Sequence, residues 1–280
     1  TFEFENIPFE TLNEINKSKP VLPKPSVNRI IQHRLAEKDF INKLNIRTTQ
    51  YTSIESKSEI ETVQNLLPGL IKTVTLGYDG KGQHRVNSIK DLDHLNIDFS
   101  KQYILEKLVK LKKEFSIIIT RFGDKKYEVY EPIENFHEDQ ILKYSIIPAD
   151  LSEKILKQSK LWATELSEAL KYIGTLCVEF FLDRNDNLYV NEIAPRVHNS
   201  GHLTINAYNI SQFENHIRAI CGLGKQELKK LYNAKMINII GDDISNFRNR
   251  SFQNNEFFFD YQKTEIKDKR KMGHLTIIEK

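Results

Sequence analysis

The sequence has few cysteines, no long apolar run and no excess of charge of one sign. Only two cysteines occur among 280 residues, and the positions of Cys177 and Cys221 fit neither a metal-binding spacing nor a disulfide framework. We therefore expect both to be core residues and the protein to reside in a reducing compartment, the cytoplasm. No uninterrupted apolar stretch approaches the roughly 20 residues of a membrane span, and there is no signal peptide.

The charge balance argues against large polyanionic partners. Lysine and arginine number 41 against 38 aspartates and glutamates, and the two signs are interleaved along the chain. We expect no nucleic acid or membrane partner, only small molecules. With 39% hydrophobic and 28% charged residues, the chain is typical of about two globular domains.

Periodicity predicts helices in the first half of the chain. Residues 1–7 alternate like a strand that has no partner before it, and the first residue is not Met, so we expect an N-terminal piece to be missing. A short helix is expected over residues 8–19. Ser26 is expected to cap a helix over residues 27–44 with one broad apolar face.

Further along, strands are expected to dominate apart from one long helix. Alternation predicts a single strand over residues 128–136, and Asp150 is expected to cap an amphipathic helix that runs to residue 173. Ser211 is expected to cap another helix. The tail from residue 225 onward should hold short strands, at residues 237–240, 257–261 and 274–278.

The densest run of functional side chains is YVNEIAPRVHNSGH, at residues 189–202. A loop that only connects elements would not need an acid, an amide, a cation and two imidazoles within fourteen positions. The aromatic run before it, residues 175–182, and the turn cluster DRNDN predict a hairpin.

The length of that hairpin turn decides where two acids lie. If residues 184–187 form a four-residue loop, Glu179 lies opposite Glu192 on one face. Two opposed carboxylates destabilise a sheet unless a cation lies between them, and they suit Mg²⁺ held together with substrate phosphates. A five-residue loop would put the acids on opposite faces. A solvent-facing hairpin with ordinary surface acids is the alternative.

A second constellation is GYDGKGQ, at residues 77–83, which follows a strand that carries Lys72. Glycines let backbone N–H groups approach an anion, and Lys72 and Lys81 supply charge, so this pattern indicates a phosphate-cradling loop. Strands flank it, so it matches neither GxxxxGK[ST] nor GxGxxG at a helix start. A glycine-rich hairpin turn is the alternative.

A basic cluster occupies residues 267–271. From the charges alone, it can be interpreted as a solvated charge run.

Seven runs together resemble one family, the 5-(carboxyamino)imidazole ribonucleotide synthases, which are PurK-type ATP-grasp enzymes of purine biosynthesis. The likeness is collinear over essentially the whole chain and is carried by FEFENIP, QHRLAEKDF, GYDGKGQ, VEFFLD, NEIAPRVHNSGH, SQFENHIRAI and RKMGH. It implies ATP-dependent carboxylation of 5-aminoimidazole ribonucleotide by bicarbonate through carboxyphosphate. ADP and phosphate would be released, and ATP and Mg²⁺ would be needed.

The resemblance also implies the architecture. We expect an α+β ATP-grasp fold with the end of an N-terminal α/β, Rossmann-like domain (1–25), an ATP-grasp domain (26–222) and a small C-terminal β-rich domain (223–280). A mobile lid over the ATP is expected at residues 49–112. We further expect a homodimer.

Site residues follow from the resemblance, position by position. Arg196, His198, Asn199 and Ser200 would line the bicarbonate and imidazole pocket, and Glu179 and Glu192 would hold the metal. Lys263, Arg270 and Lys271 would clamp the ribonucleotide phosphate. The nucleotide would be held by Arg34, Lys72, Gly77, Tyr78, Asp79, Gly80, Lys81, Gly82, Gln83, Glu106, Lys107, Leu108, Val109, Glu114, His137, Asn191 and Glu192.

Three positions depart from the family pattern. Leu76 and Gln262 stand where the family has glycine, and Val197 stands where it has proline. We expect Leu76 to stiffen the phosphate loop and Val197 to loosen its own loop slightly. Two other functions stay open: a different ATP-grasp carboxylase or ligase, which would lack RVHNSGH and RKMGH, and a non-catalytic nucleotide-binding remnant.

Overall fold

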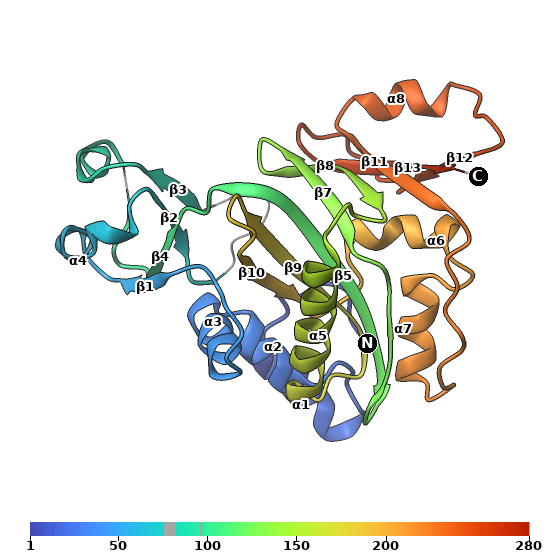
Figure 1. Cartoon of the computed structure of the whole chain (residues 1–280), viewed down its shortest axis with the longest axis horizontal. Helices are drawn as coiled ribbons and strands as arrows, with labels where there is room; N and C mark the ends of the chain where they lie inside the picture. The colour runs from blue at the N-terminus through green and yellow to red at the C-terminus, as the bar shows by residue number, and fades with distance from the viewer. Residues whose placement is uncertain (76–81, 96, 280) are drawn as a thin grey trace.

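A computed structural model describes residues 1–75, 82–95 and 97–279 and arranges their strands in two sheets (Figure 1). The small sheet has the strand order β1-β4-β2-β3. The large sheet has the order β10-β9-β5-β7-β8-β11-β13-β12, with β6 paired to β5. This is the expected α+β architecture. Among the described residues, no helix is both long and apolar enough to span a membrane.

The small sheet forms a lobe with its own core. Its strands are β1 (Tyr51–Ile54), β2 (Gly69–Thr73), β3 (Gln83–Val86) and β4 (Tyr103–Lys107), and the short helix α4 (Lys57–Thr62) packs beside them. Ile54, Ile60, Ile71 and Leu105 are buried together in this lobe. In Figure 1 it projects to the left of the large sheet. The small lobe can therefore form one wall of a cleft, separate from the walls that the large sheet forms.

The large sheet contains the main core. Its first strands are β5 (Leu111–Gly123), β6 (Lys126–Val129), β7 (Ile133–Glu138), β8 (Ile141–Ile147), β9 (Gly174–Asp183) and β10 (Leu188–Ala194). Side chains alternate across a strand, so Val178 and Phe180 of β9 enter the core that α5 (Glu153–Ala169) covers. Cys177 faces a second buried cluster on the other side, whereas Cys221, which was also expected in the core, is exposed. Glu179 shares that side with Cys177.

The C-terminal strands continue the same sheet. β11 (Asn233–Ile240) pairs with β8 on one edge and with β13 (Lys271–Glu279) on the other, and β12 (Glu256–Asp260) closes the order. These strands cover all three expected strand positions in the tail. The short helix α8 (Asp243–Arg248), which the sequence analysis did not predict, connects β11 to β12.

Two predicted helices differ in their boundaries. The expected helix over residues 27–44 is two helices, α2 (Pro25–Ile31) and α3 (Arg34–Lys43), because the chain becomes extended at His33. The His33 side chain accepts a hydrogen bond from Ala36 N at 3.3 Å and so starts α3, whereas Ser26 caps nothing. Ser152, not Asp150, caps α5. Ser211 caps α7 (Gln212–Ile220), as predicted. The position of α1 (Phe9–Ser18) was also predicted correctly.

Two predicted strands were wrong. Residues 1–7 form bends and turns rather than a strand. The expected strand over residues 128–136 is split into β6 and β7. Pro132 lies between them. Proline has no N–H to donate to a ladder, so strand pairing is interrupted there although the alternation of apolar and polar residues continues.

Candidate active-site cleft

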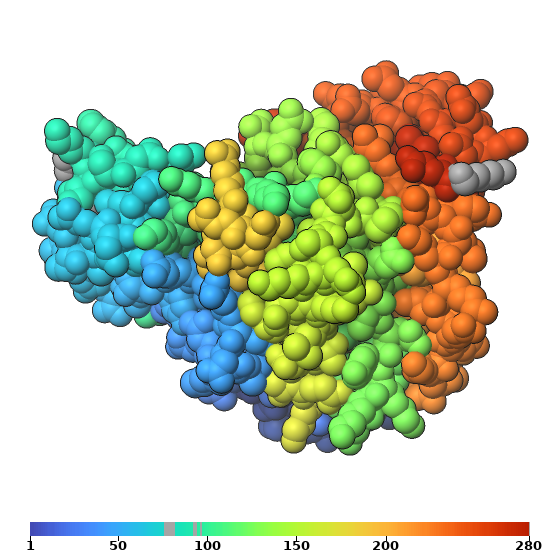
Figure 2. Space-filling view, viewed as in Figure 1, coloured from blue at the N-terminus to red at the C-terminus, as the bar shows by residue number. Residues whose placement is uncertain are grey.

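One cleft of about 1150 Å³ gathers most of the predicted site residues. Its walls come from the small lobe, from the β9–β10 hairpin, from α3 and from the C-terminal strands. The small lobe and the C-terminal strands lie at opposite ends of the molecule (Figure 2). Segments far apart in the sequence therefore meet in a single space.

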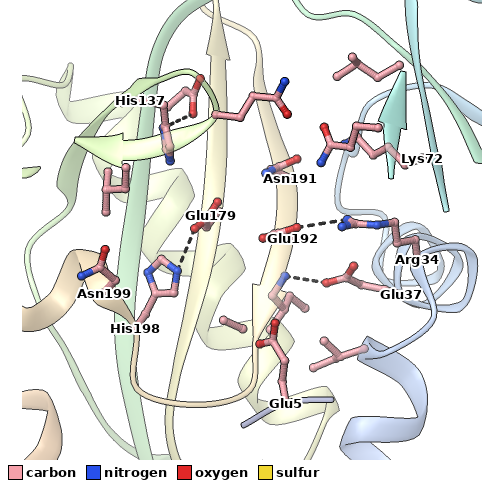
Figure 3. Close-up of a pocket in the computed structure, with 18 of the residues that line it drawn as sticks. Glu5, Arg34, Glu37, Lys72, His137, Glu179, Asn191, Glu192, His198 and Asn199 are labelled. Atoms are coloured by element: carbon pink, nitrogen blue, oxygen red, sulfur yellow. Dashed lines mark hydrogen bonds and ion pairs between the residues drawn. The ribbon is translucent and has the colours of Figure 1, made fainter. Parts of the chain in front are cut away.

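Glu179 and Glu192 are direct partners across the β9–β10 ladder, as predicted. The turn is not the expected one, because Leu188 pairs with Leu182 and five residues lie between them. That turn alone would place the two acids on opposite faces. A bulge at Asn191 shifts the register by one residue and returns Glu192 to the position opposite Glu179. Figure 3 shows both carboxylates on adjacent strands in the middle of the cleft.

Each of the two acids already has a cationic partner. Glu179 Oε1 lies 3.1 Å from His198 Nε2, and Glu192 Oε2 lies 3.2 Å from Arg34 Nη1 (Figure 3). Burial alone would raise the pKa of Glu179, but His198, aided by His137 and the Asn191 amide, lowers it to about 2. The Glu179 carboxylate is therefore ionised at neutral pH.

His198 is held on every side. Burial would lower its pKa, but contacts with the Cys177 thiol and the Glu179 carboxylate raise the pKa of His198 to about 10. Its Nδ1 lies 2.8 Å from Ser200 Oγ. The Gln212 side chain accepts from His198 N at 3.0 Å and donates to His198 O at 2.7 Å, so it fixes the backbone as well.

Ser200 does not line the cleft, contrary to the prediction. It is fully buried, and its hydroxyl lies between His198 Nδ1 and Ser116 Oγ, 2.7 Å from the latter. The sequence shows a hydroxyl in a polar loop but not that the 3-10 turn over Asn199–Leu203 directs it inward. Ser200 is therefore in a position to orient His198 rather than to contact a substrate.

Arg196 and Asn199 do line the cleft. Arg196 Nε donates to Glu5 Oε2 at 2.9 Å, which joins the N-terminal segment to the loop after β10. Burial works against the charge of Arg196, but Glu5 raises its pKa, so the guanidinium stays protonated. Asn199 exchanges hydrogen bonds with Asn238 of β11 at 2.9 and 2.7 Å.

Lys72 faces a buried carboxylate at the lobe end of the cleft. Its Nζ lies 3.1 Å from Glu106 Oε2, and Lys38 Nζ lies 3.5 Å from the same atom. Burial would raise the pKa of Glu106, but Lys38, Lys72 and Arg34 outweigh it and lower the pKa to about 2. Glu106 thus holds two ammonium groups. The neighbouring Lys107, Leu108 and Val109 line the cleft beside it.

Lys38 and Glu37 belong to this region but were not predicted. Glu37 is buried and accepts a hydrogen bond from Ile193 N at 2.6 Å. Burial and the nearby Glu192 charge raise the pKa of Glu37 to about 8. With Arg34, these residues occupy positions i, i+3 and i+4 of α3, so one polar helix face was visible in the sequence. The pattern did not reveal that the hairpin buries this face.

The remaining predicted nucleotide residues are partly described. Glu114 Oε2 lies 2.9 Å from His137 Nδ1, and both line the cleft. Gly82 has φ +72, and its carbonyl accepts from Thr73 N at 3.1 Å, which closes the β2–β3 connection. Gln83 also lines the cleft. Leu76 and five predicted loop residues, Gly77, Tyr78, Asp79, Gly80 and Lys81, lie outside the described part of the chain.

The three C-terminal cations meet at the far wall. Lys263, Arg270 and Lys271 all line the cleft, and Lys263 Nζ donates to Lys271 O at 2.7 Å. Gln262, which stands where the family has glycine, has φ +54. Glycine adopts that left-handed conformation without strain, so the departure is tolerated at some conformational cost.

Two family models match the chain. The ATP-grasp domain matches residues 39–213, and the phosphoribosylaminoimidazole carboxylase C-terminal domain matches residues 234–280. The first covers the small lobe and the hairpin with its two acids. The second covers the C-terminal segment that carries Lys263, Arg270 and Lys271.

Individual proteins resemble the chain over nearly its full length. An N5-carboxyaminoimidazole ribonucleotide synthase of Brucella melitensis is 36% identical over 99% of this chain and 78% of its own length. A crystal structure of a PurK N5-carboxyaminoimidazole ribonucleotide synthetase with ADP superposes with a TM-score of 0.93 at 36% identity, covering 100% of this chain and 75% of that one. An Aspergillus clavatus synthase with ADP and 5-aminoimidazole ribonucleotide gives 0.88 at 27% identity, covering 98% and 75%. The chain belongs to the N5-carboxyaminoimidazole ribonucleotide synthase family of ATP-grasp enzymes.

Proposed function

We propose that the cleft makes carboxyphosphate from ATP and bicarbonate and passes its carboxyl group to the amine of 5-aminoimidazole ribonucleotide. The coarser reaction follows from family membership: the chain is an ATP-dependent ligase that forms a C–N bond in purine biosynthesis. The proposal adds the route and the residues. The observation that carries it is the meeting, in one cleft, of Lys72, the Glu179–Glu192 pair and the three C-terminal cations.

The two acids suit Mg²⁺. Glu179 and Glu192 are direct cross-strand partners that both line the cleft, and the Asn191 side chain beside them adds a further oxygen. Hard oxygen donors of this kind hold Mg²⁺ together with substrate phosphates. When bound, the ion would neutralise charge on the phosphoryl group that is transferred. Arg34 and His198, which now contact these acids, are then available to phosphate or bicarbonate oxygens.

The lobe end of the cleft would hold the nucleotide. Lys72 is presented by β2 and kept in place by Glu106, so its ammonium group would meet a phosphate with little loss of side-chain freedom. The Lys107–Val109 backbone offers donors and acceptors to adenine, and Glu114 can accept hydrogen bonds from ribose hydroxyls. Of the three glycines of the predicted phosphate loop, Gly82 lies in the described part of the chain, and it closes the loop next to Lys72.

The middle of the cleft would hold bicarbonate. A bicarbonate oxygen attacks the γ-phosphorus, the bond to the ADP oxygen breaks, and ADP leaves. Arg196 is a fixed cation for the resulting carboxyphosphate, and Asn199 supplies an amide donor. The amine of the ribonucleotide then attacks the carboxyl carbon, phosphate leaves and the amine loses a proton. His198, which Ser200 still orients once Glu179 holds the ion, is the proposed proton carrier.

The far wall would hold the ribonucleotide phosphate. Lys263, Arg270 and Lys271 place two ammonium groups and one guanidinium at the same end of the cleft. Charge-assisted hydrogen bonds from such groups to phosphate are short and strong. This wall separates the present assignment from ATP-grasp ligases whose substrates carry no ribonucleotide phosphate. We also propose a homodimer and a cytoplasmic location, the latter from the scarcity of cysteine.

Arg196→Ala tests the route directly. The variant should still bind ATP in the presence of Mg²⁺ but should lose bicarbonate-dependent ADP formation, because its cation acts on carboxyphosphate rather than on the nucleotide. With the unaltered chain, labelled bicarbonate should appear as an acid-labile carbamate on the aminoimidazole only when ATP is present. Incorporation of labelled formate, or cleavage of ATP to AMP, would show that the chemistry is a different one.

A further inference from the structure

A second set of metal-ligating side chains shares Glu179 with the pair of acids and includes the buried Cys177. Cys177, Glu179 and His198 each offer one ligand atom, and these atoms all lie within 4.8 Å of one another. Cys177 and Glu179 are two residues apart on β9 and so share a face, and His198 approaches from the loop after β10. Strand β9 and the loop after β10 thus place a sulfur, an oxygen and a nitrogen close together.

We propose that this cluster is a binding site for Zn²⁺, and that Zn²⁺ bound there blocks the enzyme. Zinc takes thiolate sulfur at about 2.3 Å and imidazole nitrogen or carboxylate oxygen at about 2.0–2.2 Å, in a tetrahedron. Such distances give ligand-to-ligand edges of about 3.3–3.6 Å. His198 Nε2 and Glu179 Oε1 are already 3.1 Å apart, and the Cys177 sulfur, which lies within 4.8 Å of the other two ligand atoms, would move inward on binding. Two of the three residues, Glu179 and His198, also line the cleft.

The surroundings of His198 favour coordination through Nε2. Its Nδ1 is engaged by Ser200 Oγ at 2.8 Å, and the Ser200 hydroxyl is in turn held by Ser116 Oγ at 2.7 Å. A polar group on the far ring nitrogen is what orients a metal-ligating histidine in proteins. On binding, the ion replaces the proton shared by Nε2 and Glu179 and displaces the thiol proton of Cys177, and both protons pass to solvent.

The sulfur sets this site apart from the Mg²⁺ site. Mg²⁺ prefers six oxygen ligands and has little affinity for thiolate, whereas zinc and cobalt bind thiolate readily. Because Glu179 belongs to both sets, Zn²⁺ would remove one carboxylate from ATP-dependent chemistry and immobilise His198. The loss of turnover rests on the proposed function. The binding itself does not.

Binding is tested first, without turnover. Zn²⁺ alone should bind the chain at a one-to-one ratio in calorimetry, and Co²⁺ alone should give the near-ultraviolet absorption of a thiolate-to-cobalt bond. Cys177→Ser should weaken Zn²⁺ binding at least tenfold and abolish that absorption. Cys221→Ser is the matched control, because Cys221 is the exposed cysteine, and it should change neither result. His198→Gln should also weaken the binding, which guards against a folding defect specific to Cys177→Ser.

Turnover is tested second. Zn²⁺ should inhibit ATP-dependent carboxylation by the unaltered chain and by Cys221→Ser, and a chelator should restore it, whereas Cys177→Ser should stay active in the same Zn²⁺. Equal Zn²⁺ affinity in Cys177→Ser and the unaltered chain, or a cobalt complex without thiolate absorption, overturns the site. Tight binding through Cys177 without inhibition would uphold the site and count instead against the proposed roles of Glu179 and His198.

Discussion

Glu179 faces Glu192 across two neighbouring strands because one residue, Asn191, is extra in β10. The five-residue turn that precedes it would by itself turn Glu192 to the opposite side, and the bulge reverses that displacement. Bulges near active sites commonly redirect a side chain in this way. Here the redirected side chain completes a pair of carboxylates that no isolated hairpin would place together without a cation.

Glu192→Gln should abolish turnover while nucleotide binding is largely kept. The substitution retains the shape and removes the charge, and a metal ligand matters most as charge develops in the transition state. We expect kcat to fall by about 100-fold or more, the size of losing one charge-stabilising group. Phosphate release and calorimetry with ATP and Mg²⁺ measure the two effects. Glu138→Gln, at an exposed acid outside the cleft, is the control, and an unchanged kcat in Glu192→Gln would rule out the role.

Lys72→Ala and Arg270→Ala should separate the two phosphate sites. The two cations line the same cleft but come from the small lobe and from the segment before β13. Loss of a charge-assisted contact costs about 1.5–3 kcal/mol of binding free energy. Lys72→Ala should therefore weaken ATP, and Arg270→Ala should weaken 5-aminoimidazole ribonucleotide and leave ATP nearly unchanged. Calorimetry with each ligand decides, and equal loss of ATP affinity in both variants would show that the C-terminal cations are not a separate clamp.

Gly201→Ala should lower turnover by moving a neighbour. A Cβ at residue 201 would lie 2.6 Å from Gln212 Oε1, closer than atoms in contact can approach. Gln212 holds both backbone groups of His198, so its displacement should loosen that imidazole. We expect kcat to fall with ATP affinity unchanged. In a double-mutant cycle, Gln212→Ala should make Gly201→Ala nearly neutral, and simple additivity of the two effects would contradict the link.

Glu37→Gln should change how stability depends on pH. The pKa of Glu37 is raised to about 8 in the folded chain from an ordinary value of 4.5. Between these values the folded chain holds a proton that the unfolded chain releases, so stability falls as pH rises. For this reason the free energy of unfolding falls by up to about 1.4 kcal/mol per pH unit, and Glu37→Gln lacks this pH dependence. The stability of Glu37→Gln relative to the unaltered chain should therefore increase between pH 5 and 8, as measured by denaturant unfolding.

Glu106→Gln is the control for that experiment, because its shift has the opposite sign. The pKa of Glu106 is lowered to about 2, so its stabilising contribution is complete above 4.5 and is lost only as pH falls toward 2. The difference between Glu106→Gln and the unaltered chain should be flat between pH 5 and 8. Parallel pH curves for the unaltered chain and Glu37→Gln would show that Glu37 is ionised when folded.

The strands and the paired acids could be predicted because their signals are local. Alternation and turn residues located the hairpin, and the opposition of Glu179 and Glu192 followed from register. The details of that register could not be predicted, since the longer turn and the bulge cancel one another. Nothing in the residues from Asp183 to Asn191 distinguishes the two arrangements. The other contacts of β10, from Val190 N to Arg47 O and from Ile193 N to Glu37, involve residues far away in the sequence.

The residues missed by the sequence analysis are those whose role depends on burial. Glu37 and Lys38 occupy a polar helix face that the hairpin covers, and a helical pattern cannot show that a charged face is buried. Ser200 was assigned to the cleft although its hydroxyl turns away from it toward Ser116. Residue type indicates the chemistry that the loop could support, but the direction of each side chain depends on contacts between segments far apart in the chain.

The pairing of β11 with β8 gives the C-terminal segment a protective role. The ladder from Ala234↔Ile147 to Ile237↔Tyr144 crosses the boundary between the two family models, so no flexible joint separates them. Without the strands after residue 222, β8 would present a row of unpaired N–H and C=O groups, which is a template for aggregation. The segment that supplies the proposed phosphate clamp therefore also covers this edge of the sheet, and we expect a chain truncated at residue 222 to aggregate.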